Sequence, residues 1–197
     1  FAKAAELIQL AWQLPMNPRI TSRIEPLRSM TRINPTEAFA MSQNAGGQFD
    51  YQVRGAMAEE LIEKDPDEAL QQLEQTKNWQ AFLTSDNLAK KLLASKDPAA
   101  HKTARRLVVL MEKIAEAEKP PRYFPTVAKR WTDLGEHDKA KKFIDRTLSS
   151  EKPSDGLTTS AAVALAAYDF DRAKQIVSAY DDDWNRAQAV ISMSLTI

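Results

Sequence analysis

Alanines recur along the chain at a nearly constant spacing, each of them early in a segment whose apolar residues have helical periodicity. The steps between successive alanines are 33, 31, 35, 36 and 33 residues, and the residues are Ala5, Ala38, Ala69, Ala104, Ala140 and Ala173. Self-similarity at this scale is typical of stacked-repeat architectures. An apolar residue follows four positions later in four copies, on the same helix face: Leu73, Val108, Ile144 and Val177. Each alanine is therefore predicted to let two helices approach closely.

Helix-start signals precede these alanines. Asn34, Asp65 and Asp97 are each followed by proline, and a capping side chain before a first-turn proline favours the beginning of a helix. In two later copies an acidic residue, Glu136 or Asp169, stands just ahead of the helix, where a negative charge stabilises the helix dipole.

A preceding helix is predicted before each of the five later alanines. Its ranges are 20–33, 51–64, 87–95, 123–134 and 157–168, and residues 184–195 resemble one more such helix. Breaks are expected at the segments 15–18, 44–48, 120–121 and 153–156, which are rich in proline or glycine. The chain ends on apolar residues where a solenoid normally carries a polar cap. We therefore expect the parent protein to continue beyond Ile197, or this end to pack against another surface.

The units resemble the bacterial tetratricopeptide-like (TPR-like) group of αα repeats, in which Asp-x-x-x-Arg and an Ala- and Leu-rich helix precede Asp-x-x-x-Ala and a second helix. Asp169, Ala173, Asp182 and Arg186 carry this pattern best. The predicted fold is all-α, an αα-hairpin repeat solenoid of about six helix pairs forming a right-handed superhelix. It is expected to span residues 1–197 as one helical-repeat domain, excised from a longer protein. The resemblance implies binding of a peptide or protein partner.

Composition narrows the class of protein further. Of 197 residues, 43% are hydrophobic and 27% charged, as in ordinary soluble domains. Cysteine is absent, which excludes disulfides, thiolate zinc sites and cysteine nucleophiles. Apolar runs are too short for a membrane-spanning helix, so membrane insertion is not expected. These features leave the compartment, cytoplasmic or extracytoplasmic, open.

The charge is balanced overall but unevenly distributed. Twenty-seven basic and 27 acidic residues give a net charge of zero, which argues against a dedicated nucleic-acid-binding protein. Residues 50–86 nevertheless carry 3 basic and 9 acidic side chains, and residues 90–146 carry 15 and 8. The basic block indicates either solvated helix faces or a surface for an acidic partner. A docking edge between copies of the chain is a further alternative.

Four residues are the candidates for partner binding. Arg105, Lys139 and Lys142 fall on second helices of adjacent repeats, where their charges could receive an acidic peptide. Trp79 stands beside polar residues, which makes an exposed, partner-binding position as plausible as a core position, because large aromatics are enriched at binding hot spots. Trp131, followed three residues later by Leu134, is expected to be a core residue.

Chemistry within the chain is not expected. His101 and His137 each precede a repeat alanine by three residues, but two histidines without a fixed third ligand make a poor metal site. Glu136 or Asp138 would have to complete it. The acidic runs are explained by helix starts, and no nucleotide-binding loop, zinc-protease motif or nucleophile elbow is present. The leading hypothesis is a non-enzymatic scaffold without cofactor or metal. The alternative is a helical accessory domain of a larger enzyme or sensor whose catalytic part lies outside this chain.

Overall fold

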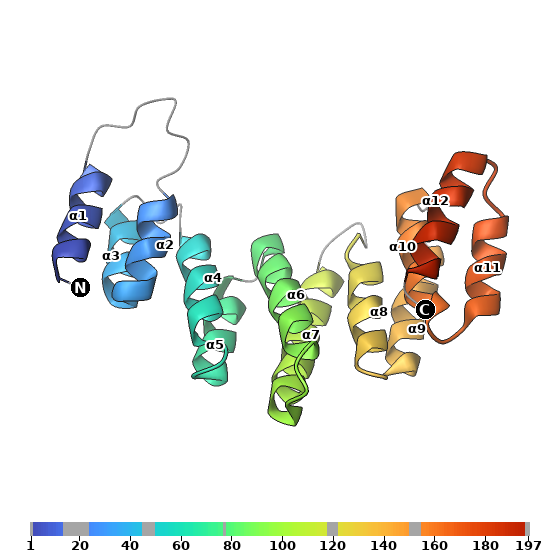
Figure 1. Ribbon diagram of the computed structural model, residues 1–197, viewed down its shortest axis with the longest axis horizontal. Coiled ribbons are helices and arrows are strands. Elements are labelled where there is room, and N and C mark those ends of the chain that lie inside the picture. The colour runs from blue at the N-terminus through green and yellow to red at the C-terminus, as the bar shows by residue number, and fades with distance from the viewer. Residues whose placement is uncertain are drawn as a thin grey trace. The chain divides into compact units, whose positions relative to one another are not determined.

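The computed structural model describes residues 2–13, 24–44, 50–76, 78–117, 122–149 and 155–195. Every regular element in these ranges is an α-helix (Figure 1), so the all-α prediction is confirmed for the described residues. The predicted breaks at 15–18 and 120–121 lie outside these ranges, as do 45–48 and 153–154. The helices are α1 (Ala2–Gln13), α2 (Ile24–Ile33), α3 (Pro35–Asn44), α4 (Asp50–Leu61), α5 (Pro66–Thr76), α6 (Trp79–Leu93), α7 (Pro98–Ala117), α8 (Phe124–Asp133), α9 (His137–Leu148), α10 (Asp155–Ala166), α11 (Phe170–Ser178) and α12 (Asp183–Ser194).

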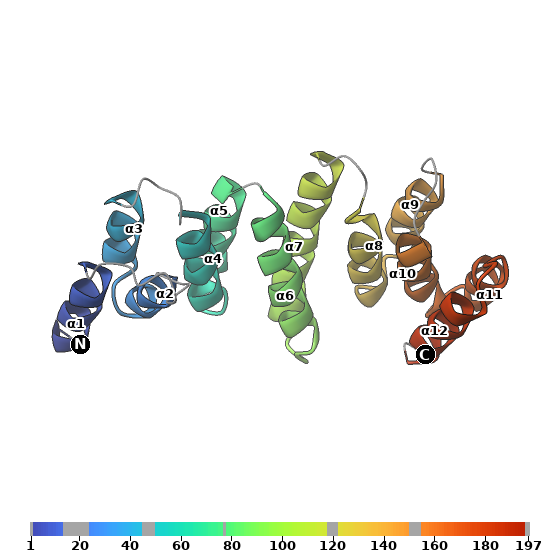
Figure 2. The same ribbon diagram turned by 90° about the horizontal axis from the view of Figure 1, so that it is seen from above.

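The chain divides into two compact units, Phe1–Thr84 and Ser85–Ile197, with the boundary inside α6. In the first unit α2 packs on α3 and α4 packs on α5, while α2 also contacts α4. In the second unit α8 packs on α9 and α10 on α11, while α10 also contacts α8 and α12. Figure 2 shows the paired helices side by side within each unit. Consecutive helices therefore form the basic packing pair in both units.

Capping side chains begin several helices where the sequence predicts. Asn34 Oδ1 and Asp65 Oδ1 each accept a hydrogen bond from the backbone N–H three residues on, at 3.2 and 3.1 Å. Asp97 Oδ1 accepts from the N–H two residues on, at 2.9 Å. These bonds satisfy N–H groups that the first helical turn leaves without partners. Glu136, in contrast, makes no side-chain cap to α9.

Some predicted boundaries differ from the structure. α4 ends at Leu61 where a helix to residue 64 was predicted, and α10 begins at Asp155, inside the predicted break at 153–156. The largest difference concerns α6. The helix expected over 87–95 begins eight residues earlier, since α6 extends from Trp79 to Leu93. Asn78 causes the early start, because its Oδ1 accepts from the N–H groups of Gln80 and Ala81 at 3.0 and 3.1 Å. An asparagine cap without a following proline is a weaker sequence signal than the Asn-Pro and Asp-Pro pairs elsewhere.

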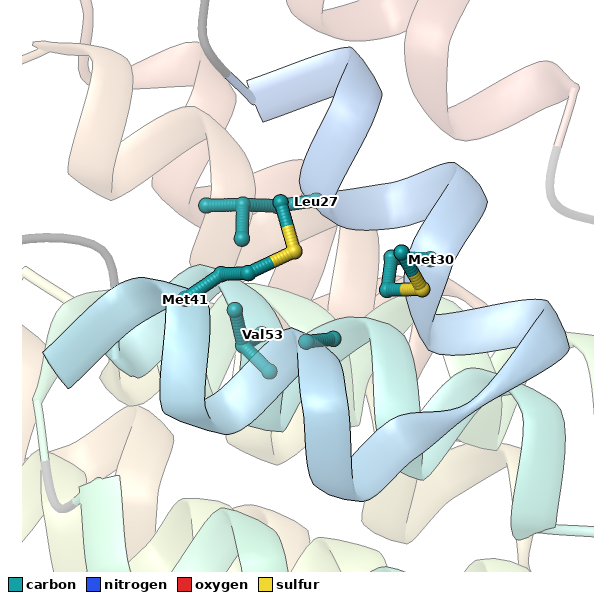
Figure 3. Close-up of a cluster of buried hydrophobic side chains, with 5 residues drawn as sticks. Leu27, Met30, Met41 and Val53 are labelled. Carbon is teal, nitrogen blue, oxygen red and sulfur yellow. The ribbon is translucent and has the colours of Figure 1, made fainter. Parts of the chain in front are cut away.

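The recurring alanines are core residues. Ala38, Ala69, Ala104, Ala140 and Ala173 have no exposed surface, and Ala5 is half-buried. The apolar residues four positions later are buried as well. In the first unit Ala38 belongs to a cluster with Leu27, Met30, Met41 and Val53 (Figure 3). Five of the six recurring alanines are thus buried, as their predicted packing role requires.

A buried ion pair is a second packing element, within the second unit. The Arg130 side chain on α8 is 9% exposed and donates to Asp86 Oδ1 at 2.6 Å and to Asp133 Oδ2 at 2.7 Å. Burial disfavours the charged guanidinium, but the hydrogen bonds and charges of Asp86 and Asp133 outweigh it and raise the pKa of Arg130. The guanidinium therefore stays charged and links α8 to α6.

Candidate functional site

A pocket in the first unit lies between α4 and α6 and has a volume of about 250 Å³. On each helix the lining residues recur at a spacing of four, which places them on one helix face. Arg28 of α2 completes the rim. The lining residues are Arg28, Tyr51, Gln52, Gly55, Ala56, Glu59, Trp79, Gln80, Leu83 and Thr84. This pocket contains Trp79, one of the four residues predicted to bind a partner.

Gly55 is one of the residues that line this pocket. It is buried in the middle of α4, and a Cβ at this position would lie 3.4 Å from Thr84 Oγ1 on α6. Glycine in a helix interior costs about 0.5–1 kcal/mol relative to alanine. The Thr84 side chain of α6 packs against the α4 backbone at this position.

Apolar side chains remain accessible at the rim. Trp79 is 46% exposed and Leu83 is 44% exposed, and the two residues are four positions apart on α6. Single exposed apolar residues are common, but a large aromatic beside a concave pocket is typical of a binding surface. The sequence left open whether Trp79 lies in the core or at the surface, and the structure places it at the surface.

Two of the residues that line the pocket have amide oxygens without hydrogen-bond donors. Gln52 Oε1 and Gln80 Oε1 are both buried and have no partner among the described residues. Gln52 Nε2 donates to the Tyr51 hydroxyl at 2.9 Å, so only the oxygen end of that amide is unsatisfied. A buried acceptor without a donor costs about 1–3 kcal/mol. A ligand that supplies N–H groups would remove this cost.

The three basic candidates lie in the second unit, and carboxylates neutralise them there. Arg105 of α7 forms an ion pair with Glu136, and Lys139 lies 3.8 Å from the same carboxylate. Lys139 Nζ also lies 4.1 Å from the centroid of the Trp131 ring. The hydrogen bond from Arg105, together with the charges of Arg105 and Lys139, holds the pKa of Glu136 below its usual value against the opposing effect of desolvation.

Lys142 is paired in the same way. Its Nζ lies 3.8 Å from Glu112 and 3.7 Å from Glu116, both on α7. The structure therefore brings Arg105, Lys139 and Lys142 together along α7 and α9, but each of them already has a carboxylate within ion-pair distance. Trp131, whose ring contacts Lys139, is fully buried, as predicted for a core residue.

The histidines hold no metal-binding geometry. His101 Nε2 donates to the Ser95 carbonyl at 2.8 Å, and the His137 ring stacks on Tyr168 with centroids 4.7 Å apart. Among the described residues no group of three or more His, Cys, Asp or Glu side chains is arranged to hold a metal ion.

The acidic runs have structural partners in the described ranges. Glu60 pairs with Arg32 at 3.1 Å, and Asp183 pairs with Arg186 at 2.9 Å. Asp182 caps α12 by accepting from the Trp184 N–H at 2.8 Å. The Asp182 cap is a helix-start contact of the kind predicted for these runs, whereas the ion pairs of Glu60 and Asp183 were not predicted.

Sequence reasoning missed most of the α4–α6 pocket. Tyr51, Gln52 and Gln80 were not singled out, because their contribution depends on how two helices separated by α5 approach each other. The signals present in the sequence were local: a glycine in the middle of a predicted helix, and Asn78 as a cap that places Gln80 and Leu83 on the first turns of α6.

Comparison with family models, with curated proteins and with solved structures found no match to this chain. None of the helices in the described part of the chain combines the length and apolar character needed to cross a membrane. The site therefore has to be interpreted from its own chemistry.

Proposed function

We propose that this chain is a non-enzymatic helical-repeat scaffold, a TPR-like αα solenoid, which binds a peptide segment of a partner protein in the pocket between α4 and α6. The observation that carries the proposal is the exposed Trp79 and Leu83 pair beside the unsatisfied oxygens of Gln52 and Gln80. Such a pocket offers an apolar platform and hydrogen-bond acceptors, which are the two features that a peptide uses.

The repeat interpretation is supported by packing within each unit. Consecutive helices pair, the first helices of adjacent pairs contact each other, as α2 and α4 or α8 and α10 do, and the periodic alanines are buried. In an αα array these features recur because each pair buries its apolar face only against its neighbours.

The chemistry of the pocket favours an extended peptide with one apolar anchor. The volume of about 250 Å³ is below the range of roughly 300–1,000 Å³ of pockets for drug-sized ligands, and it suits a single large side chain. Backbone N–H groups of the peptide would reach Gln52 Oε1 and Gln80 Oε1 after rotation about the terminal amide torsions, which are broad. The surrounding residues 50–86 are acidic, which disfavours an acidic peptide at this pocket.

Arg105, Lys139 and Lys142, here called the basic strip of α7 and α9, are a weaker candidate for the peptide site. An acidic partner there would have to compete with Glu112, Glu116 and Glu136 for the cations. Exposed ion pairs contribute little to stability, so such competition is feasible, but each of the three cations already has a carboxylate within ion-pair distance, and among the described residues no apolar side chain comparable to Trp79 is exposed beside them. We therefore place the peptide site at Trp79.

Selection of peptides on the intact chain tests this proposal. The tightest peptide from a phage-displayed random library is measured by calorimetry against the parent, Trp79→Ala and Trp184→Ala. Trp79→Ala should weaken binding about tenfold or more, as hot-spot tryptophans do. Trp184, which is also exposed, lies on α12 and provides the matched control with an unchanged dissociation constant.

The double variant Arg105→Glu, Lys142→Glu distinguishes binding at the α4–α6 pocket from binding at the basic strip. Unchanged affinity is expected if the peptide lies at Trp79. Peptides that bind Trp79→Ala as tightly as the parent, and lose affinity only with the double charge reversal, would contradict the α4–α6 site and favour the basic strip.

A further inference from the structure

A second groove lies wholly within the second unit, between α11 and α12, with a volume of about 320 Å³. Its floor and walls are mostly apolar, and its charged lining residues are both basic. The lining residues are Phe170, Lys174, Val177, Ser178, Arg186, Val190, Met193 and Ser194. This groove is separate from the α4–α6 pocket and independent of the function proposed for it.

A comparison with α10 indicates what would fill the groove. Both α10 and α12 have 12 residues and begin with aspartate, so end-to-end alignment places Val190 at the position of Ala162. Ala162 is fully buried, whereas Val190 is 54% exposed. Among the described helices α10 contacts α8, α9, α11 and α12, whereas α12 contacts only α10 and α11. The exposed surface of α12 around Val190 thus corresponds to a surface of α10 that neighbouring helices bury.

The covering helix on α10 also shows which side chains suit such a surface. α11 packs on α10 and buries Ala173 together with Val177, a small residue and an aliphatic residue four positions apart. An apolar face of this type lets two helices approach within the usual interaxial distance of about 8–10 Å.

The charges of the groove indicate the rest of the ligand. Lys174 is exposed and forms no ion pair with a described residue, and no carboxylate lines the groove among those residues. Arg186 Nη2 donates a hydrogen bond to the Tyr180 carbonyl at 3.1 Å and forms an ion pair with Asp183 at 2.9 Å. Arg186 Nε, however, is buried without an acceptor in the described part of the chain. Anionic oxygen atoms on the incoming helix would satisfy both basic groups.

We propose that the α11–α12 groove binds an acidic amphipathic helix of a partner protein. The apolar face of this helix carries a small residue and an aliphatic residue at i and i+4, and its carboxylates pair with Lys174 and Arg186. Helix-in-groove docking with apolar anchors at helical spacing is a recurring mode of peptide recognition.

A helix of this chain supplies a defined probe. The sequence of α5, Pro66–Thr76, has Ala69 and Leu73 at the required spacing and three acidic residues without a basic one. A covalently constrained 66–76 peptide, labelled with a fluorophore, is titrated with the intact chain by anisotropy. Constraint is needed because an isolated helix of this length is marginal in water. In the control peptide Asp67, Glu68 and Glu74 are replaced by their amides.

The parent should bind the acidic peptide, and Val190→Glu should weaken binding about tenfold. Lys174→Glu should weaken it severalfold and reduce the dependence on salt. Val109→Glu, at an exposed apolar position on α7, is the matched control and should bind like the parent. Circular dichroism confirms that each variant folds.

Three results would overturn the proposal. Equal binding to Val190→Glu and the parent, or absence of binding to the parent, would exclude the groove. Equal affinity for the amide peptide would exclude an acidic ligand in favour of a neutral helix. Self-association of the parent that Val190→Glu abolishes, measured by light scattering, would identify a second copy of the chain as the occupant. None of these results depends on Trp79.

Discussion

Tyr168 illustrates how one buried side chain with an unsatisfied polar group can make stability depend on pH. Its ring stacks on His137, but its hydroxyl is buried without a hydrogen-bond partner in the described ranges. Burial raises the pKa of Tyr168 to about 12, with the negative charges of Asp169 and Asp145 adding to the shift and Arg172 opposing it. The neutral phenol is therefore favoured in the folded state.

This shift predicts a loss of stability at high pH. The unfolded chain releases the Tyr168 proton near its ordinary pKa of about 10, whereas the folded chain holds it to about pH 12. The contribution of this protonated phenol to the free energy of unfolding is fully present below about pH 10. It is lost as the pH rises toward 12, because the unfolded state then binds fewer protons than the folded state. Tyr168→Phe should remove this dependence. It should also raise the free energy of unfolding at neutral pH by about 1 kcal/mol, since the unpaired hydroxyl is gone.

Urea denaturation between pH 7 and pH 12, together with phenolate absorbance over the same range, measures both effects. Tyr51→Phe is the control, because the Tyr51 hydroxyl accepts a hydrogen bond from Gln52 and its loss should not raise stability. A Tyr168→Phe variant that keeps the high-pH absorbance step of the parent would contradict the assignment.

At the scale of one helix, α9 shows why the periodic alanines are small. Ala140 has no exposed surface and shares its face with Ile144, which is also fully buried. A leucine at Ala140 would force side chains out of their preferred rotamers or push the helix away from its neighbours. Overpacking of this kind costs about 1–3 kcal/mol.

Ala140→Leu should therefore lower the free energy of unfolding by about 1–3 kcal/mol in urea titrations. Lys141→Leu, at the adjacent exposed position of the same helix, should change it by less than about 0.5 kcal/mol. If Ala140→Leu were as stable as the parent, the helix could move to accept the larger side chain and the alanine period would not reflect tight packing.

The elements that the sequence predicts well are those that depend on neighbours within one helical turn. Asn34 and Asp65 cap helices through N–H groups three residues away, and the alanine face follows from the spacing of four. The pairing of Arg105 with Glu136 joins residues 31 positions apart, and periodicity does not specify it. The basic strip therefore looked unpaired in the sequence, whereas the fold supplies its carboxylates.

The same reasoning explains which part of the candidate site could be predicted. Trp79 stood out because a large aromatic beside the polar residues Asn78 and Gln80 is as plausible at a binding surface as in the core. Its pocket did not stand out, because Gly55 and Thr84 come together only when α4 and α6 approach each other. Local chemistry indicated the residue, and tertiary packing created the concave surface around it.

At the scale of the whole molecule, the zero net charge is the sum of two opposite units. Phe1–Thr84 carries 8 basic and 11 acidic residues, a net of −3, and Ser85–Ile197 carries 19 and 16, a net of +3. A chain of zero net charge lacks the mutual repulsion that keeps proteins apart in solution. Opposite units on different molecules attract each other instead.

Weak attraction between molecules is therefore expected near pH 7 at low ionic strength. Raising sodium chloride from about 20 mM to about 200 mM shortens the Debye length below about 10 Å and should screen this attraction. The second virial coefficient from static light scattering should become more positive with salt.

The triple variant Lys90→Gln, Lys102→Gln, Lys141→Gln removes three exposed charges and leaves the second unit neutral and the chain at −3. Its molecules should repel each other, so its coefficient should fall with salt. The same sign of response in both proteins would mean that the attraction does not arise from the charge asymmetry between the units.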